Sequence, residues 1–270
     1  FLIPVSMAFD TIKKRQADAS IAAGEPAEIP KTNLKDLALG GFLCGLALTI
    51  AVNLQQSGVG DSGAGKAGFI TALYVVLVPV LGILLKKHVP SQVWVSAVIA
   101  VAGLYLLCIK EGFTIVQSDF YLLCCAFMFA VQIMLVDHFV KTVDGVKLSC
   151  AQFAVVSILS AICMFIFEDV PTWEIIKASA APLIYTGVFS SGIAYTLQII
   201  AQKDANPTVL SLLLSLEAVF ATLSGAVLLK EQMMGREYIG CILMFAAVIL
   251  SQLPSKSEIE SKEIKGDVSE

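Results

Sequence analysis

The feature that most constrains this chain is a series of eight long apolar segments joined by short connections that carry nearly all of the charge. A helix needs about 20 apolar residues, at a rise of about 1.5 Å each, to cross the roughly 30 Å hydrocarbon layer of a bilayer. We therefore expect an all-α polytopic membrane protein with about eight complete spans. The segments lie at approximately 37–57, 67–85, 92–109, 118–137, 148–167, 178–201, 206–229 and 237–253.

The composition supports a membrane protein and argues against several other classes. Hydrophobic residues make up 57% of the 270-residue chain and charged residues 15%, against about 45–50% and about 25% in soluble domains. The net charge of -4 and the lack of a basic stripe give no indication of a nucleic-acid partner. The seven cysteines lie in apolar segments without CxxC spacing, which favours small buried side chains over disulfides or zinc ligands. We expect no cofactor and no metal site.

The two ends of the chain differ from the apolar segments. Residues 1–9, FLIPVSMAF, are apolar but too short to span, and they lack the charged start and cleavage site of a signal peptide. We interpret them as the end of a span whose beginning is missing. Residues 10–36 are expected to form a polar loop, and the charged tail at 254–270 is expected to be a disordered cytoplasmic segment.

The distribution of lysine and arginine predicts the orientation of the chain. If loop 10–36 is cytoplasmic and every segment crosses, 13 of the 18 basic residues lie on the cytoplasmic side and 5 on the outer side. Cytoplasmic loops of membrane proteins carry an excess of these residues. We therefore expect a multi-pass protein of the cell membrane with a cytoplasmic C-terminus.

A weak internal repeat relates the two halves of the chain. GLALTIAVNLQQ (45–56) matches GIAYTLQIIAQK (192–203) at glycine, alanine, threonine and glutamine positions, and two further apolar segments follow each copy. Five spans separate the matching elements, so the two copies are expected to have opposite orientations in the membrane. Inverted repeats of this kind are typical of transporters with a site near the midplane.

Two pairs of motifs in these repeats point to a known family. They are FITALYVVLVPVL (69–81) with GLYLL (103–107), and LLLSLEAVF (212–220) with KE (230–231). In these motifs the chain resembles the EamA-type proteins of the drug/metabolite transporter superfamily. The resemblance implies ten helices in two inverted five-helix repeats, here at 1–109, without the first helix and most of the second, and at 118–253. It also implies transport of small organic metabolites, with export of amino acids or related compounds as the family's best-known activity.

Glu217 is the sharpest candidate functional residue, because it lies near the middle of the apolar stretch 206–231. A carboxylate at that depth is costly and usually faces a bundle interior or a watery cavity, where it could bind a cationic or polar substrate group or carry a proton. Alternatively, it holds helices together or supports a kink. The chain departs from the family pattern at Ala218, where a proline often follows this acid, and at Lys87, where the second repeat has Glu231.

Uncharged polar residues in other spans could line the same cavity with hydrogen-bonding groups. Tyr195 and Gln198 lie three positions apart and therefore share a helix face. Interhelical hydrogen bonding is the alternative for each of them, since many polar residues in membranes do only that. Besides Glu217, the candidate substrate-binding residues are Tyr195, Gln198, Gln132, Gln152, Asn53 and Tyr74.

Three other patterns are expected to have structural roles. GDSGAGK (60–66) imitates a phosphate-binding loop, but Ala67 removes the magnesium-binding hydroxyl and no strand precedes the motif, so we interpret it as a turn between two helices. Asp137 and His138 are expected to be solvated at a cytoplasmic helix end. Gly41 and Gly45 form a GxxxG pattern that could let two helices approach closely.

Together these features favour a secondary active transporter of small organic metabolites that works by alternating access, driven by a gradient rather than by nucleotide. Its partners would be a small-molecule substrate, the lipid bilayer and, as a coupling ion, protons. The alternative from another class is a non-transporting membrane scaffold or subunit, whose polar residues would pack together without a cavity. A membrane-embedded enzyme would need a nucleophile–base pair or metal ligands at one depth, and the sequence indicates neither.

Overall fold

The fold was analysed in a computed structural model, which describes residues 11, 33–62, 64–87, 89–109, 116–168, 170–228, 230 and 233–253. Within these ranges all regular elements are helical, and eight helical segments are long and apolar enough to cross a membrane. The prediction of an all-α polytopic membrane protein is therefore confirmed. The spans are Leu34–Gly60, Gly65–Leu84, Ser91–Cys108, Gln117–Phe139, Gly145–Phe167, Ala180–Gln202, Pro207–Leu228 and Gly235–Gln252. The stub at 1–9, most of the loop at 10–36 and the tail at 254–270 lie outside the described residues.

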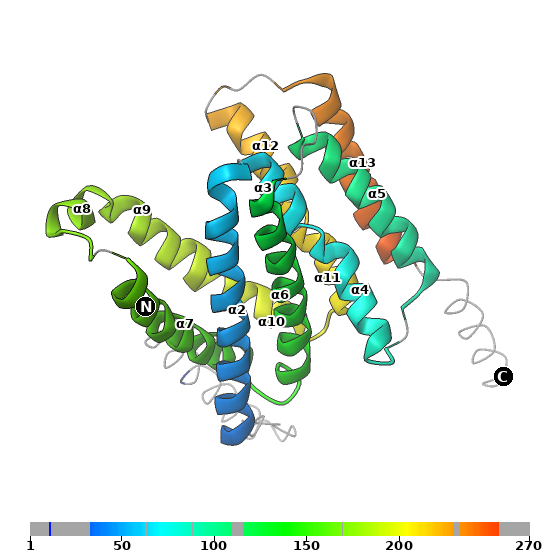
Figure 1. The fold of residues 1–270 in the computed structure, drawn as a ribbon. Coiled ribbons are helices and arrows are strands. Elements are labelled where there is room, and N and C mark those ends of the chain that lie inside the picture. The colour runs from blue at the N-terminus through cyan, green and yellow to red at the C-terminus, as the bar shows by residue number, and fades with distance from the viewer. Residues whose placement is uncertain are drawn as a thin grey trace, which may run out of the picture. The chain divides into compact units, whose positions relative to one another are not determined.

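Some spans consist of more than one helical element (Figure 1). The stretch 206–229, expected to be one segment, is divided into two helices, and the segment 178–201 contains a π-helix. The elements are α2 (Leu34–Ser62), α3 (Ala64–Thr71), α4 (Tyr74–Leu84), α5 (Ser91–Cys108), α6 (Gln117–Phe139), α7 (Gly145–Phe167), α8 (Trp173–Ala178), α9 (Ala180–Tyr185), the π-helix η1 (Thr186–Ala194), α10 (Tyr195–Gln202), α11 (Pro207–Leu214), α12 (Glu217–Leu228) and α13 (Gly235–Gln252).

The chain forms two compact units, and each is described by itself. Unit 1 comprises Phe1–Ile50 and Leu135–Ala205, and unit 2 comprises Ala51–Met134 and Asn206–Glu270. Helices α2 and α6 begin in one unit and end in the other. Each unit draws segments from both expected repeats, so the division into repeats at 1–109 and 118–253 stays a prediction.

Unit 1 has an apolar core formed by residues of α2, α6, α7 and α10, including Cys44, Leu148 and Ile199. The GxxxG pattern lies where α2 meets α7. A methyl group at Gly41 would lie 2.5 Å from Cβ of Ala151, and one at Gly45 would lie 2.7 Å from Cβ of Val155. Since such distances are too short for two carbon atoms, only glycine permits this approach, and the expected close packing is confirmed.

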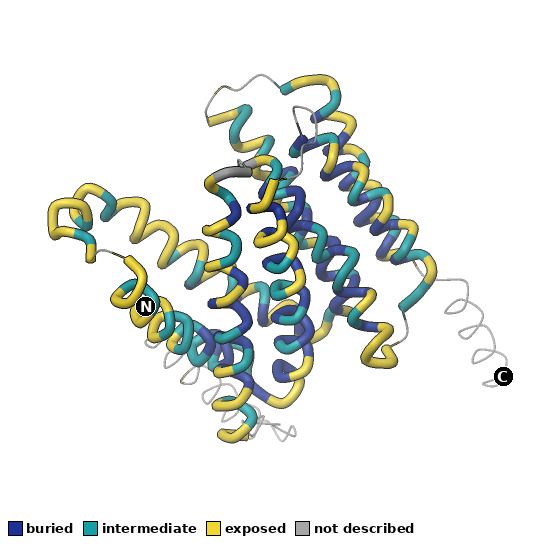
Figure 2. Tube along the Cα trace, viewed as in Figure 1, coloured by how far each residue is buried: buried dark blue, intermediate teal, exposed yellow. Residues whose placement is uncertain are grey.

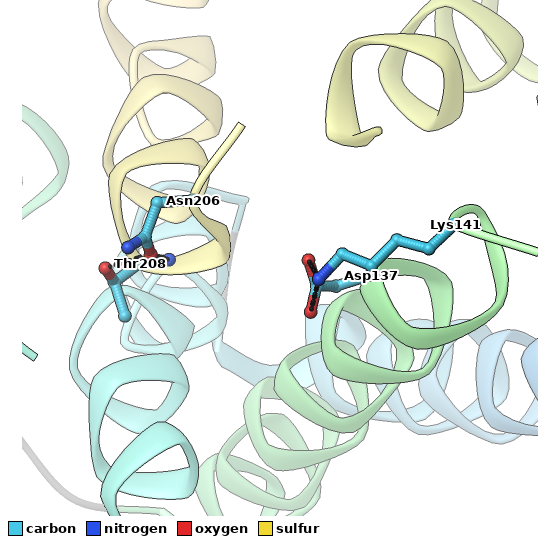
Figure 3. Close-up of polar contacts among 4 residues, drawn as sticks. All are labelled: Asp137, Lys141, Asn206 and Thr208. Atoms are coloured by element: carbon cyan, nitrogen blue, oxygen red, sulfur yellow. Dashed lines mark hydrogen bonds and ion pairs between the residues drawn. The ribbon is translucent and has the colours of Figure 1, made fainter. Parts of the chain in front are cut away.

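The connection between α6 and α7 corrects one expectation. Asp137 is only 1% exposed rather than solvated, and it forms an ion pair with Lys141, one helical turn later, at 3.1 Å (Figure 3). The neighbouring ammonium group allows the carboxylate to be buried, because it offsets the lost hydration. His138 is exposed, as expected. Helix α7 then begins after Asp144, whose Oδ1 accepts hydrogen bonds from the amides of Val146 and Lys147.

Unit 2 is organised around α5 and α13, which pack side by side and antiparallel (Figure 1). The side-chain amide of Gln92 donates to the carbonyl of Leu250 at 3.0 Å, and Nε of Arg236 donates to the carbonyl of Leu106 at 3.1 Å. These two bonds tie opposite ends of the pair. Buried and exposed residues alternate along both helices, so each keeps an exposed apolar face (Figure 2).

The two halves of unit 2 repeat at a constant spacing of 144 residues. This number separates the donors Gln92 and Arg236, and it also separates the acceptors Leu106 and Leu250. It separates the beginnings and the ends of α5 and α13. It also separates Lys86 and Lys230, whose φ angles of 59° and 56° lie in the left-handed region. An internal repeat predicts that helix bounds, backbone angles and hydrogen bonds recur at one constant spacing, as they do here.

One difference between these copies has a simple chemical reason. At the start of α13, Oε2 of Glu237 accepts a hydrogen bond of 2.7 Å from the amide of Met234. The equivalent positions before and in α5 are Pro90 and Val93. Because proline has no amide hydrogen, the first copy needs no acceptor there, and an apolar side chain can replace the acid.

Candidate functional site

The seven candidate substrate-binding residues are divided between the two units. Three belong to unit 1 and four to unit 2, so we describe the two groups separately. Gln132 and Gln152 are buried, Tyr74, Tyr195 and Gln198 are half-buried, and Asn53 and Glu217 are exposed. Their joint role in one cavity stays a prediction.

In unit 1 the candidates lie on two packed helices, α7 and α10. The ring of Tyr195 meets the ring of Phe153 edge to face, with centroids 5.6 Å apart, and Phe153 follows Gln152 in α7. One turn away, the hydroxyl groups of Ser149 and Thr196 share a hydrogen bond of 2.8 Å. The structure therefore brings the neighbourhoods of Gln152 and Tyr195 together.

The Ser149–Thr196 hydrogen bond was not anticipated from the sequence. Thr196 takes part in the internal repeat, but nothing in the residues around Ser149 indicates a partner. Both side chains are buried, and each satisfies the hydroxyl group of the other in an apolar layer. The pair fixes α10 against α7 directly beside Tyr195.

In unit 2 one candidate, Tyr74, packs against an apolar cluster. Tyr74, the first residue of α4, meets Phe129 of α6 edge to face at 6.4 Å. Tyr74 and Leu214 both pack against a buried cluster that includes Ala130, Ile133 and Met134 of α6. Leu214 ends α11 three residues before Glu217. Leu216, Ala218 and Val219, which flank the acid, pack in a different apolar cluster of unit 2, so only Tyr74 of the candidates is placed at the first one.

The remaining candidate of unit 2, Asn53, lies elsewhere. It is an exposed residue of α2, and its backbone carbonyl accepts a hydrogen bond of 2.9 Å from the hydroxyl of Ser57, one turn later. Neither residue belongs to the apolar cluster around Tyr74. The inclusion of Asn53 in the site therefore rests only on its being an uncharged polar residue within a span.

Two broken helices meet in this part of unit 2. The span Gly65–Leu84 is interrupted between α3 and α4 at 72–73, and the span Pro207–Leu228 is interrupted between α11 and α12 at 215–216. Helices α4 and α11 pack against each other. Both interruptions keep backbone bonds three residues back, such as Leu73 to Ile70 and Leu216 to Leu213, so each is a tightened turn within its span. The apolar pattern predicted continuous spans, and only the alternative of a kink supported by Glu217 anticipated the second interruption.

Glu217 occupies the first position of α12, directly after the break. Among the described residues of the eight spans, it is the only Asp, Glu, Lys, Arg or His more than two positions from a span end. The amides of Ala218 and Phe220 donate to the carbonyls of Ser215 and Leu216, so backbone hydrogen bonding continues through the break. The side chain is exposed and forms no hydrogen bond or ion pair with other described residues. Exposure within a span leaves the side chain open to water, lipid or a ligand.

The segment that imitates a phosphate-binding loop is largely helical. Residues 60–62 end α2, and residues 64–66 begin α3. Nζ of Lys66, the lysine that would bind phosphate, lies 2.6 Å from Oδ2 of Asp119, and both side chains are mostly buried. The interpretation as a connection between two helices agrees with this geometry. Within the described part of the chain, no group of three or more His, Cys, Asp or Glu side chains could hold a metal ion.

Comparison with known proteins identifies the family. Residues 117–253 match the model of the EamA-like transporter family. A curated relative from Archaeoglobus fulgidus, described as an uncharacterized transporter, is 33% identical over 214 residues, covering 79% of this chain and 68% of that protein. One solved crystal structure aligns with a TM-score of 0.69 and 19% identity, covering 90% of this chain and 84% of its own, which shows a shared fold. The chain is a multi-pass membrane protein that belongs to the EamA-like transporter family of the drug/metabolite transporter superfamily.

Proposed function

We propose that this transporter-family protein moves a small organic metabolite with a cationic group across the cell membrane by alternating access. The observation that carries the proposal is Glu217, a carboxylate in the middle of a span with no partner among the described side chains. A charge left against hydrocarbon would be costly, so an aqueous path, a bound cation or a proton is needed beside it.

The other candidates of unit 2 favour an organic substrate rather than a bare ion. Tyr74 packs against the cluster that contains Ile133, the neighbour of Gln132, and both candidates carry uncharged hydrogen-bonding groups. A substrate with an amino group and further polar atoms matches this combination of one acid with neutral donors and acceptors. Amino acids and related amines fit this description, and export is the direction that the family resemblance favours.

In the proposed cycle, Glu217 alternates between binding the substrate cation and binding a proton. Proton entry would neutralise the carboxylate and release the cationic group, which couples substrate movement to a proton gradient. The two copies of the repeat would open the site to one side of the membrane at a time. The distribution of basic residues supports a cytoplasmic C-terminus for this cycle.

The proposal is tested with full-length protein reconstituted in liposomes. Vesicles are loaded with labelled amino acids and amines, with uncharged metabolites as a matched control panel, and efflux is followed with and without a proton gradient. Gradient-dependent efflux of at least one cationic compound is expected. If no member of either panel moves faster than in protein-free vesicles, the scaffold alternative replaces the proposal.

A further inference from the structure

Two segments of unit 1 are equivalent in sequence but differ in helical geometry. Residues 39–47, LGGFLCGLA, lie in α2, and residues 186–194, TGVFSSGIA, form η1. They extend the internal repeat toward the N-terminus at a spacing of 147 residues without a gap. The identical positions pair Gly40 with Gly187, Phe42 with Phe189, Gly45 with Gly192, Ala47 with Ala194 and, just beyond the two segments, Thr49 with Thr196.

The two segments use different hydrogen bonds. In the π-helix, the amide of Tyr195 donates to the carbonyl of Ser190, five residues back, instead of to Ser191 as in an α-helix. In α2, the hydroxyl of Thr49 donates to the carbonyl of Gly45 at 2.8 Å. The equivalent Thr196 instead pairs with Ser149 of α7.

The two segments also differ in how tightly they are packed. The α-helical copy packs tightly, since a methyl group at Gly40, Gly41 or Gly45 would lie within 3 Å of a neighbouring atom. A methyl group at Gly187 would meet no atom of the described residues within 4 Å. Most residues of η1 are exposed, and Gly192 is its only buried residue. One copy is therefore closely packed and the other has room to change.

The part of this span before Tyr195 is less restrained than the part after it. Helix α10 packs on α7 and is fixed there by the Ser149–Thr196 hydrogen bond. Helix α9, η1 and α10 follow one another along one continuous span (Figure 1). Converting one π turn to an α turn would rotate the preceding residues by about 100° and shift them by about 1.5 Å.

We propose that residues 39–47 and 186–194 exchange α and π geometry when the transporter changes sides, one segment being π-helical while the other is α-helical. The inference rests on the proposed alternating access, in which two inverted copies take each other's conformation in the opposite state. Equivalent sequences that adopt both geometries in one structure provide such a pair of states. The exchange turns the residues before Tyr195 relative to the candidate residues on α7 and α10.

The test uses full-length protein in liposomes and a deletion of Ser191. Removing this residue makes Ser190 the fourth residue before Tyr195 instead of the fifth, so the segment becomes α-helical without moving α10. Hydrogen exchange, measured by mass spectrometry, is compared for peptides covering 183–198 and 36–50. We expect at least tenfold slower exchange in the first peptide and faster exchange in the second. Efflux of a labelled amino-acid and amine mixture should fall at least tenfold.

A second variant keeps the chain length unchanged. Gly187→Ala favours the regular α-helix, since its methyl group has room, and it should slow efflux at least threefold. Gly68→Ala is the matched control, because Gly68 is also helical and has no neighbour among the described residues within 4 Å of the added methyl group. This variant should leave efflux unchanged.

The exchange and flux measurements separate two kinds of failure. Unchanged exchange at 36–50 in folded variants, together with wild-type efflux, would overturn the inference. If the wild type moves none of the probes, the proposed function fails, while the opposite changes at 183–198 and 36–50 still decide whether the two segments are coupled. If the deletion variant does not fold, Gly187→Ala and its control decide the outcome.

Discussion

The crossing of α5 and α13 allows a stability prediction to be worked out from distances. A methyl group at Gly240 would lie 2.8 Å from the carbonyl oxygen of Gly103 and 2.8 Å from Cγ of Leu107. Ordinary contact begins at 3.4 Å, so Gly240→Ala requires the helices to separate by about 0.6 Å. Overpacking of this kind costs about 1–3 kcal/mol, which the higher helix propensity of alanine, about 1 kcal/mol, offsets in part.

The control for this prediction is again Gly68→Ala, where the methyl group has free space. Gly68→Ala should raise the free energy of unfolding by up to about 1 kcal/mol, because alanine has the higher helix propensity and the added methyl group causes no overpacking at this position. Gly240→Ala should therefore be about 1–3 kcal/mol less stable than this control. The free energy of unfolding is measured in mixed detergent micelles from the fluorescence of Trp94 and Trp173.

The double variant tests whether the two glycines form one contact. A methyl group at Gly103 would lie 3.0 Å from the carbonyl oxygen of Gly240. Since the first substitution already separates the helices, the second should cost less in its presence than alone. If Gly240→Ala proves as stable as Gly68→Ala, or if the two substitutions are additive, the close crossing does not exist and the packing argument for unit 2 is refuted.

Three further predictions concern polar contacts. Asp119→Asn removes the charged partner of the mostly buried Lys66 and should lower the free energy of unfolding by about 3 kcal/mol. A double-mutant cycle of Asp119→Asn with Lys66→Met should give a coupling energy of at least about 1 kcal/mol, and a coupling energy of zero would contradict the ion pair. Asn206→Ala removes the acceptor that binds the amide and hydroxyl of Thr208 at the start of α11 (Figure 3), and it should lower the unfolding free energy by about 1 kcal/mol, while Asn206→Asp should not. Asp144→Ala should lower stability by a similar amount at the start of α7, and Asp144→Ser should restore most of it.

The spans could be predicted well from the sequence because length and apolar composition are the properties that a bilayer demands. The close approach at Gly41 and Gly45 could also be predicted, since small residues four positions apart are a direct requirement of close helix packing. The interpretation of residues 60–66 as a connection between two helices agrees with the end of α2 at Ser62 and the start of α3 at Ala64.

Other features depend on contacts that the amino-acid pattern does not show. Asp137 was expected to be solvated, but the packing of its neighbours Val136 and Phe139 in the core of unit 1 buries it, while Lys141 supplies the ion pair. The breaks before Tyr74 and before Glu217 occur in largely apolar segments, where no proline or glycine marks the position. The π geometry before Tyr195 is equally invisible, since a matching sequence is α-helical in the other copy.

The central claim is that Glu217 binds a substrate cation and exchanges it for a proton. The most direct measurement compares wild-type protein with Glu217→Gln in liposomes, following proton-driven efflux and, separately, exchange of labelled for unlabelled substrate without a gradient. We expect Glu217→Gln to lose gradient-driven efflux at least tenfold, since a neutral amide cannot carry the proton. Wild-type rates in both assays would contradict the claim and assign Glu217 to a structural role at the start of α12.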